Sequence, residues 1–207
     1  MCPKMTLTVT DEPPDRPAWV AETLRLVAEA TGEGRDRLLA RVARATDAEL
    51  GSGSADAWGA GQIAVHLLLI ERGVALIALR LARGEPSGRT GQPRPAASAV
   101  TRDGIVGLAL KAAAAMRQLR DEFPAAPDLA TAAAHPYYGQ LNAVGWLLTL
   151  PNHYRAHLEA LERGTASALS PEAGHTRRPT AGSGGRRMVK DATGTAALET
   201  FSQDGRS

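Results

Sequence analysis

The sequence contains five histidines, and two of them, His153 and His157, stand four residues apart. In an α-helix this separation places both imidazoles on one face, about 6 Å apart along the axis. Neutral imidazole is a common ligand of divalent metal ions, so the pair is suited to chelate a single ion. Two histidines at this spacing also arise by chance, and the pair by itself is therefore not specific for a metal site.

A third histidine, His66, lies in the most apolar stretch of the chain, among Ile63, Leu67, Ile70 and Val74. A lone histidine on such a face is more often a hydrogen-bonded core residue than a ligand. Burial of an imidazole without a polar partner costs free energy, so a polar group has to face His66 from elsewhere in the fold. The histidine pair would be that group if the two helices concerned are neighbours.

If the two helices are neighbours, the imidazoles of His66, His153 and His157 converge on one point and could hold one metal ion. Three protein ligands leave coordination positions open for water or substrate, which is the pattern of a catalytic rather than a structural metal site. In the alternative interpretation, the histidines only stabilise the core of a non-catalytic bundle. Of the other two histidines, His135 precedes a proline and is expected to be structural, and His175 falls in a predicted C-terminal tail.

Several further residues could contribute to such a site, and each also has a plainer structural interpretation. Gln62 and Thr149 each precede a histidine by one turn, so they would either contact the ligands or serve as ordinary polar residues of a bundle. Glu71 is a candidate general base near the metal, or a charge at the bundle rim. Tyr138 is a candidate catalytic residue and, with Tyr137, could close the mouth of the site, although aromatic residues in turns are more often hydrophobic plugs.

Apolar residues recur at intervals of three and four over four long stretches, which predicts four helices. We expect these helices at residues 18–46, 60–83, 101–122 and 140–163. Gly32 and Gly34 weaken the middle of the first helix, and Pro151 is expected to bend or restart the last one. Helices of this length, joined by glycine- and proline-rich connections, predict an all-α four-helix bundle.

Both ends of the chain differ from its periodic centre. Residues 1–16 are expected to form a flexible leader, because their prolines oppose regular structure. Residues 165–207, rich in Gly, Ser, Thr and Arg, are expected to form a disordered tail. The bundle domain is then predicted over residues 17–164.

Composition narrows the classes of function. Hydrophobic residues make up 43% and aromatic residues 4% of the 207 residues, which is typical of a soluble helical chain and not of a β-sandwich. The formal net charge is only +2, without a basic stripe interleaved with aromatics, so no nucleic-acid partner is expected. Charged residues within the apolar stretch 63–82 favour a bundle helix over a membrane span. The single cysteine, Cys2, and the lack of a signal-peptide core predict a cytoplasmic protein.

Three segments, in this order, resemble the DinB-like (DinB/YfiT-like) superfamily of metal-binding four-helix bundles. The first is AWGAGQIAVHLLLIERG, with Trp58 and His66, and the second is HPYYGQLNAVGWLLTL, a His-Pro-aromatic-Gly entrance to the last helix. The third is NHYRAHLEAL, which carries His153 and His157. The resemblance covers residues 18–163. It implies that the three histidines bind a divalent ion, zinc or nickel, with iron and manganese as alternatives.

The superfamily includes transferases that use low-molecular-weight thiols, such as bacillithiol and mycothiol, and a maleylpyruvate isomerase. The resemblance therefore implies a metal-dependent enzyme whose ion activates water or a thiol, with thiol-dependent S-transfer or hydrolysis of a small molecule as the reaction. The alternative is a non-catalytic, stress-associated module for binding or dimerisation. The chain could form a homodimer through its alanine-rich third helix or act as a monomer, and no membrane partner is expected.

Overall fold

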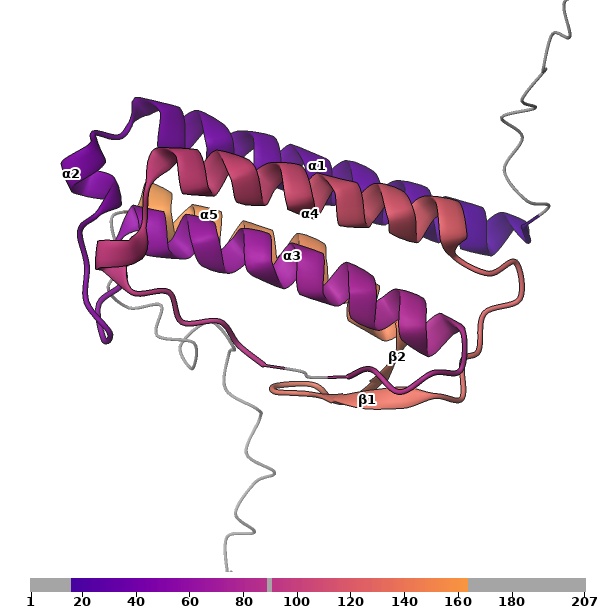
Figure 1. The fold of residues 1–207 in the computed structure, drawn as a ribbon. Coiled ribbons are helices and arrows are strands. Elements are labelled where there is room, and N and C mark those ends of the chain that lie inside the picture. The colour runs from indigo at the N-terminus through magenta and orange to yellow at the C-terminus, as the bar shows by residue number, and fades with distance from the viewer. Residues whose placement is uncertain (1–15, 89–90, 164–207) are drawn as a thin grey trace, which may run out of the picture. The chain divides into compact units, whose positions relative to one another are not determined.

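The computed structural model of the chain describes residues 16–88 and 91–163. These residues form four long helices, one short helix, a turn of 3-10 helix and a two-stranded hairpin (Figure 1). In chain order the elements are α1 (Ala18–Arg44), α2 (Asp47–Leu50), α3 (Ala60–Ala82), η1 (Ala97–Ala99), α4 (Arg102–Glu122), β1 (Ala132–His135), β2 (Gly139–Asn142) and α5 (Ala143–Glu162). The predicted tail, and the predicted leader up to residue 15, lie outside the described residues.

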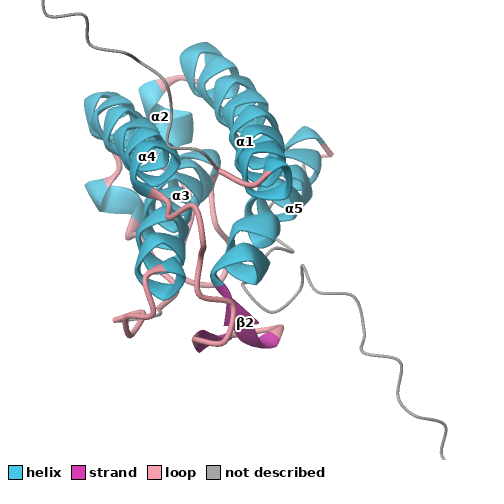
Figure 2. Cartoon of the chain, turned by 90° about the vertical axis from the view of Figure 1, so that its right-hand side faces the viewer, coloured by secondary structure: helices cyan, strands magenta, loops and turns pink. Residues whose placement is uncertain are grey.

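The four long helices pack side by side around a shared core (Figure 2). α3 packs against α4 and α5, and α5 also packs against α1. α3 and α4 run in the same direction, whereas α1 and α5 run in the opposite direction (Figure 1). Two parallel helices that follow each other in the chain need a connection that returns along their length. Residues 83–88 and 91–101 belong to this connection, and we call these described residues the returning loop.

The core consists of apolar side chains from all four long helices. α3 contributes most to it, with aliphatic residues such as Ile63, Leu67 and Leu81 fully buried. By length and composition alone α3 could cross a membrane, and 67% of its most apolar window is buried among the other elements. A core helix of a bundle meets the same criteria, which is how we interpret α3.

The predicted four-helix bundle is confirmed, but the prediction of a purely α-helical chain is wrong at one place. The last helix was expected to begin at residue 140, but residues 139–142 form β2 and pair antiparallel with β1, with His135 opposite Gly139. Gly139 has φ of +75°, a left-handed conformation that glycine adopts without strain, and this makes the tight connection feasible. The strand β1 has the sequence Ala-Ala-Ala-His, which lacks the β-branched and aromatic residues that indicate strands.

A second correction concerns residues 47–50, which were expected to belong to a connection and instead form α2. The Thr46 hydroxyl accepts a hydrogen bond from the Glu49 N–H at 3.2 Å, and the Glu49 carboxylate accepts one from the Thr46 N–H at 2.6 Å. This reciprocal capping satisfies two backbone donors at the start of the helix. The Thr-x-x-Glu pattern that carries it can be seen in the sequence.

Pro151 was expected to bend or to restart the last helix. Of these two alternatives the restart is wrong, because α5 continues from Ala143 to Glu162 with the proline inside it. Gly34 has a packing role that the sequence did not reveal. A Cβ atom at Gly34 would lie 2.9 Å from Cβ of Tyr154 on α5, which is closer than side chains can approach. The absence of a side chain at Gly34 therefore allows α1 and α5 to pack closely.

We expect Gly34→Ala to lower the free energy of unfolding by about 1–3 kcal/mol, because the added methyl group overlaps the buried Tyr154 side chain. Gly32→Ala on the same helix is the matched control, since its Cβ would lie 3.9 Å from the nearest side-chain atom. The control should raise the free energy of unfolding by about 0.5–1 kcal/mol, through helix propensity alone. Urea denaturation measures both. A Gly34→Ala variant as stable as the unmodified protein would contradict the close packing of α1 on α5.

Candidate metal centre

His66 on α3 meets His153 and His157 of α5 inside the bundle. One potential ligand nitrogen from each of the three rings lies within 4.8 Å of the other two. Nε2 of His66 is 3.0 Å from Nε2 of His153, and the ring centroids of His66 and His157 are 5.2 Å apart. The predicted meeting of three imidazoles, which required the two helices to be neighbours, is therefore present.

The orientation of His66 is set by a backbone carbonyl of the returning loop. Nδ1 of His66 lies 2.9 Å from the carbonyl oxygen of Pro93. A carbonyl only accepts hydrogen bonds, so Nδ1 carries a proton, and in the neutral ring the lone pair then belongs to Nε2. Burial lowers the pKa of His66, against a smaller opposing effect of the Pro93 hydrogen bond. The neutral ring, which is the form that binds metals, is thereby favoured, with its lone pair directed at the other two histidines.

The donor set fits a divalent transition-metal ion. Two nitrogens that bind one zinc ion tetrahedrally at about 2.0–2.1 Å lie about 3.4 Å apart. The separations here start at 3.0 Å and stay within 4.8 Å, so small movements bring the rings into range. Three imidazoles suit zinc or nickel better than magnesium or calcium, which prefer oxygen ligands. The hydrogen bond to Pro93 is of the kind that orients the histidine ligands of metals.

Gln62 acts on the site indirectly, through the returning loop. Its amide nitrogen donates to the carbonyl of Pro95 at 2.9 Å, and its Oε1 accepts from the N–H of Gly59 at 3.0 Å. The bond to Pro95 holds the loop against the start of α3. Pro95 lies two residues beyond Pro93, whose carbonyl accepts the hydrogen bond from His66. Trp58 covers the same ring from another side, with its indole and the His66 imidazole edge to face at a centroid distance of 5.0 Å.

Glu71 lies outside the histidine group and is fully buried, so the alternative of a charge at the bundle rim is wrong. Its carboxylate accepts a hydrogen bond from the Tyr154 hydroxyl at 2.6 Å and forms an ion pair with Arg35. Burial raises the pKa of Glu71, while Tyr154 and the positive charge of Arg35 act in the opposite direction. Burial and the neighbouring Glu71 carboxylate both raise the pKa of Tyr154. This network ties α3 to α1 and α5, and a general-base role for Glu71 stays a prediction.

The hairpin places its two tyrosines differently. Tyr138 is 50% exposed and packs its ring against His135, and its predicted catalytic role stays a prediction. Tyr137 instead donates a hydrogen bond to Oε1 of Gln92 at 3.0 Å, which joins the hairpin to the returning loop. His135 packs against Trp146 at a centroid distance of 4.8 Å and is not part of the histidine group, as expected.

A cavity of about 80 Å³ adjoins the histidine group, between α3, α5, the hairpin and the returning loop. His153 lines this cavity and is partly exposed, whereas His66 and His157 are buried. The group therefore opens on the side of His153. Thr149 also lines the cavity and donates its hydroxyl proton to the carbonyl of Trp146 at 2.7 Å, so it does not act on a histidine directly.

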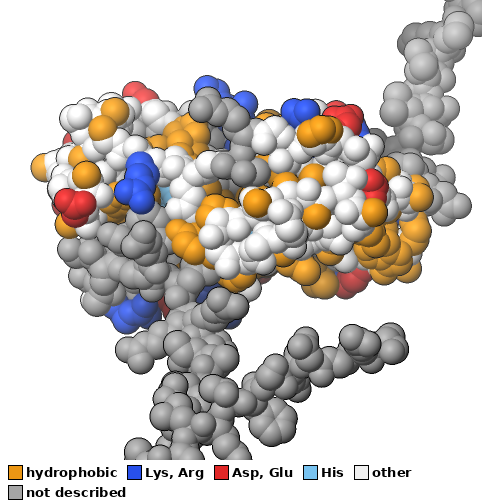
Figure 3. Space-filling view, turned by 90° about the horizontal axis from the view of Figure 1, so that it is seen from below, with side chains coloured by type: hydrophobic (Ala, Val, Ile, Leu, Met, Phe, Trp, Pro, Cys, Tyr) orange, Lys and Arg blue, Asp and Glu red, His pale blue; other side chains and the backbone are white. Residues whose placement is uncertain are grey.

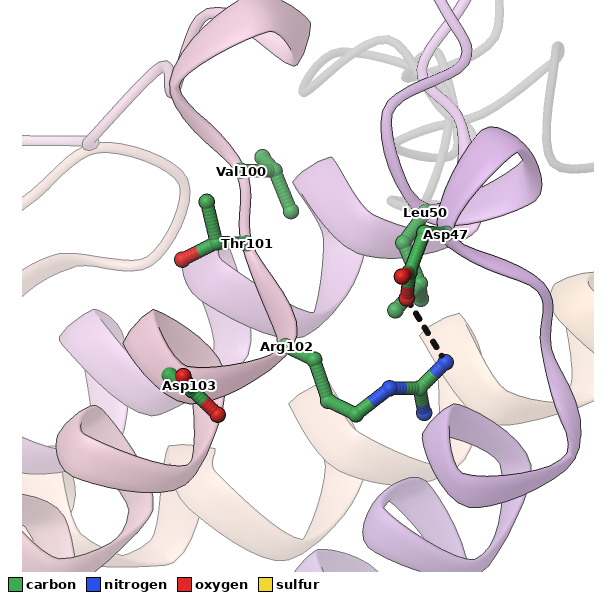
Figure 4. Close-up of a pocket in the computed structure, with 6 residues that line it drawn as sticks. All are labelled: Asp47, Leu50, Val100, Thr101, Arg102 and Asp103. Carbon is green, nitrogen blue, oxygen red and sulfur yellow. Dashed lines mark hydrogen bonds and ion pairs between the residues drawn. The ribbon is translucent and has the colours of Figure 1, made fainter.

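A second depression, of about 330 Å³, lies between α2 and the start of α4 (Figure 4). It is lined by Asp47, Leu50, Val100, Thr101, Arg102 and Asp103. Arg102 donates to the carbonyls of Val42 and Ala45, each at 2.7 Å, and to the Asp47 carboxylate at 3.0 Å. These contacts satisfy carbonyl groups at the end of α1, so Arg102 has a structural role in this depression.

Sequence reasoning missed the contribution of the returning loop to the site. The Pro93 carbonyl and the Gln92 side chain both come from a stretch whose composition indicates only a connection. A backbone carbonyl is present at every residue, so nothing in the sequence distinguishes the one that accepts from His66.

We expect Tyr154→Phe to lower the free energy of unfolding by about 1–3 kcal/mol, because the buried Glu71 carboxylate loses a hydrogen-bond donor. Tyr138→Phe is the matched control at an exposed tyrosine and should change it by less than about 0.5 kcal/mol. Thermal or urea unfolding compares the two variants. Equal stability of both would show that the Tyr154 hydroxyl does not stabilise Glu71.

Comparison with known proteins supports the fold. No protein-family model matches this sequence, and a search of curated proteins gives no match. A crystal structure described as that of "TT2238, a four-helix bundle protein" is similar, with 25% sequence identity and a TM-score of 0.51. The match covers 68% of this chain and 98% of the other. The chain is thus similar to a four-helix bundle protein over most of the bundle described above.

Proposed function

We propose that this protein is a metal-dependent enzyme of the DinB-like superfamily, which binds one divalent ion, zinc or nickel, through His66, His153 and His157. The observation that carries the proposal is the orientation of His66. Its Nδ1–H is bound to Pro93, and its Nε2 faces His153 at 3.0 Å, where a lone pair can bind an ion. Two of the segments that resemble the superfamily also lie side by side, since His66 of the first segment is next to His153 of the third.

The chain's own residues would orient the ion and shield it on one side. A bound divalent ion can lower the pKa of a water or thiol molecule, or polarise an electrophile. Pro93 holds the His66 ring in place, and Trp58 covers it, so access from that side is blocked. Substrate would approach from the cavity at His153. The described residues include no cysteine, so a reacting thiol would be supplied as a cosubstrate.

The reaction that we propose is thiol-dependent S-transfer or hydrolysis of a small molecule. Both reactions use the same property of the site, namely an ion that favours the deprotonated form of a bound nucleophile near neutral pH. The similarity to a four-helix bundle protein is compatible with either reaction and favours neither.

The protein, expressed without a histidine tag, should bind one equivalent of zinc or nickel. His66→Ala, His153→Ala and His157→Ala should each lower the metal affinity strongly, because two remaining imidazoles bind an ion much less tightly than three. Elemental analysis by mass spectrometry, after dialysis against the metal, measures the stoichiometry.

His135→Ala is the matched control, since this histidine lies in the hairpin outside the group and should leave the stoichiometry unchanged. Unfolding curves recorded for all four variants separate loss of the metal from loss of the fold. A protein without stoichiometric metal, or one in which His135→Ala has the same effect as His66→Ala, would contradict the proposal and favour a non-catalytic bundle.

Turnover by the metal-loaded protein should depend on an added thiol if the reaction is S-transfer. The assay incubates the protein with bacillithiol, mycothiol or cysteine and a panel of electrophiles, with and without the thiol. Consumption of electrophile without thiol, at an equal rate, would instead assign hydrolysis. His66→Ala serves as the inactive control in both cases, and turnover by this variant at the rate of the unmodified protein would contradict both assignments.

A further inference from the structure

The cavity beside His153 has an apolar wall and no aspartate, glutamate, lysine or arginine among the described residues that line it. Helix α3 contributes four aliphatic side chains, Leu69, Ile70, Val74 and Ile77. The polar groups come from the opposite sides, namely the hairpin, the returning loop and α5. On the face of the molecule that carries the loop and the hairpin, apolar and uncharged side chains cover the central area, and charged ones lie mainly around it (Figure 3). A ligand that carries a full charge would lose its hydration here without a compensating ion pair.

Gly73 leaves space on the α3 wall of this cavity. It stands in the interior of a helix, where glycine costs about 1 kcal/mol relative to alanine. A Cβ atom built at Gly73 would meet nothing within 4 Å, so packing does not require the glycine. A larger residue at this position would reduce the space next to Ile70 and Val74.

Trp146 of α5 forms part of the opposite wall and is 4% exposed. Its indole N–H is buried and has no hydrogen-bond acceptor among the described residues. Such a donor costs free energy until an acceptor reaches it, so a ligand or water oxygen that pairs with it would be stabilised. The Tyr137 hydroxyl, bound to Gln92 across the hairpin and the loop, lies at the same cavity.

We propose that this cavity binds an uncharged small molecule, which inserts a short aliphatic group or the edge of an aromatic ring between α3 and α5 and directs its polar atom toward His153. The size of about 80 Å³ sets the limit on the inserted group. An apolar cavity of about 150 Å³ holds a whole benzene molecule, so only part of such a ring is enclosed here. The inference rests on the proposed function, because His153 belongs both to the cavity and to the histidine group.

Benzyl alcohol is a suitable probe, with benzoate as the charged ligand of the same size. The measurement is the ¹H–¹⁵N spectrum of the full-length protein, in which the indole resonance of Trp146 is assigned with Trp146→Phe. In the metal-free protein we expect benzyl alcohol to shift this resonance saturably. Benzoate should bind at least about tenfold more weakly, because its carboxylate finds no lysine or arginine among the described residues that line the cavity.

Substitution at Gly73 tests the location of the ligand. Gly73→Leu should weaken the binding of benzyl alcohol at least about tenfold by filling the cavity. Gly73→Ala, which adds one methyl group and favours the helix, should weaken it less. Gly107→Leu is the matched control, since this glycine on α4 also has open space around its Cβ and does not line the cavity. A Trp146 resonance that does not respond, or binding that Gly73→Leu and Gly73→Ala leave unchanged, would overturn the proposal.

Benzyl mercaptan, titrated with and without zinc, tests the direction of the polar atom. Its affinity should rise at least about tenfold in the zinc-loaded protein, because sulfur is a good zinc ligand. If zinc binds stoichiometrically and this affinity does not change, the polar atom does not point to the histidines and the proposal fails. If the cavity binds benzyl alcohol and no zinc is retained, ligand binding by the cavity stands, whereas the proposed metal-dependent activity fails.

Discussion

Burying an imidazole inside a helical bundle costs free energy unless its ring nitrogens have polar partners. At His66 the Pro93 carbonyl binds one nitrogen, and the histidines of α5 face the other. The arrangement of the elements around the site follows from this requirement. α3 has to lie beside α5, and a loop has to pass close enough to α3 for a carbonyl to reach the ring. The same two contacts direct the lone pair of His66 Nε2 toward the imidazoles of His153 and His157. The polar contacts that make the burial of His66 possible therefore also form a site suited to a cation.

The returning loop is the element that joins the fold to the site. Because α3 and α4 are parallel, their connection has to run back along the bundle, and it does so beside α3. The Gln62 side chain donates a hydrogen bond to the Pro95 carbonyl of this loop, and the Pro93 carbonyl orients His66. The Gln92 side chain accepts a hydrogen bond from Tyr137 of the hairpin. One segment therefore holds a potential ligand in place and forms part of the wall of the adjoining cavity.

The polar residues of α3 and α5 belong to two separate buried groups, namely the ionic network of Glu71 and the histidine group. Glu71 follows His66 by five residues, yet its carboxylate pairs with Arg35 and Tyr154 and not with the histidines. Tyr154 follows His153 directly but points to a different side of α5, as neighbouring residues of a helix do. The described part of the bundle thus contains a buried ionic network that ties three helices together. Separate from it is a group of three imidazole rings beside a cavity whose described lining has no aspartate, glutamate, lysine or arginine. This separation keeps a carboxylate out of the candidate metal centre.

The four long helices could be predicted from the sequence, because each has to bury one face and its apolar residues recur with the helical period. The same pattern assigned three histidines to two of these helices. The sequence also contained the capping signal of α2, which is local in the chain. Three features could be seen only in the folded chain: His66 reaches His153, Pro93 supplies the hydrogen-bond acceptor of His66, and α1 meets α5 at Gly34 without room for a side chain. The folded chain also shows that residues 132–142 form a hairpin, against a composition that indicates no strand. The physical reason is that periodicity reports whether a residue is buried, whereas the identity of its neighbour depends on how the helices are arranged in space.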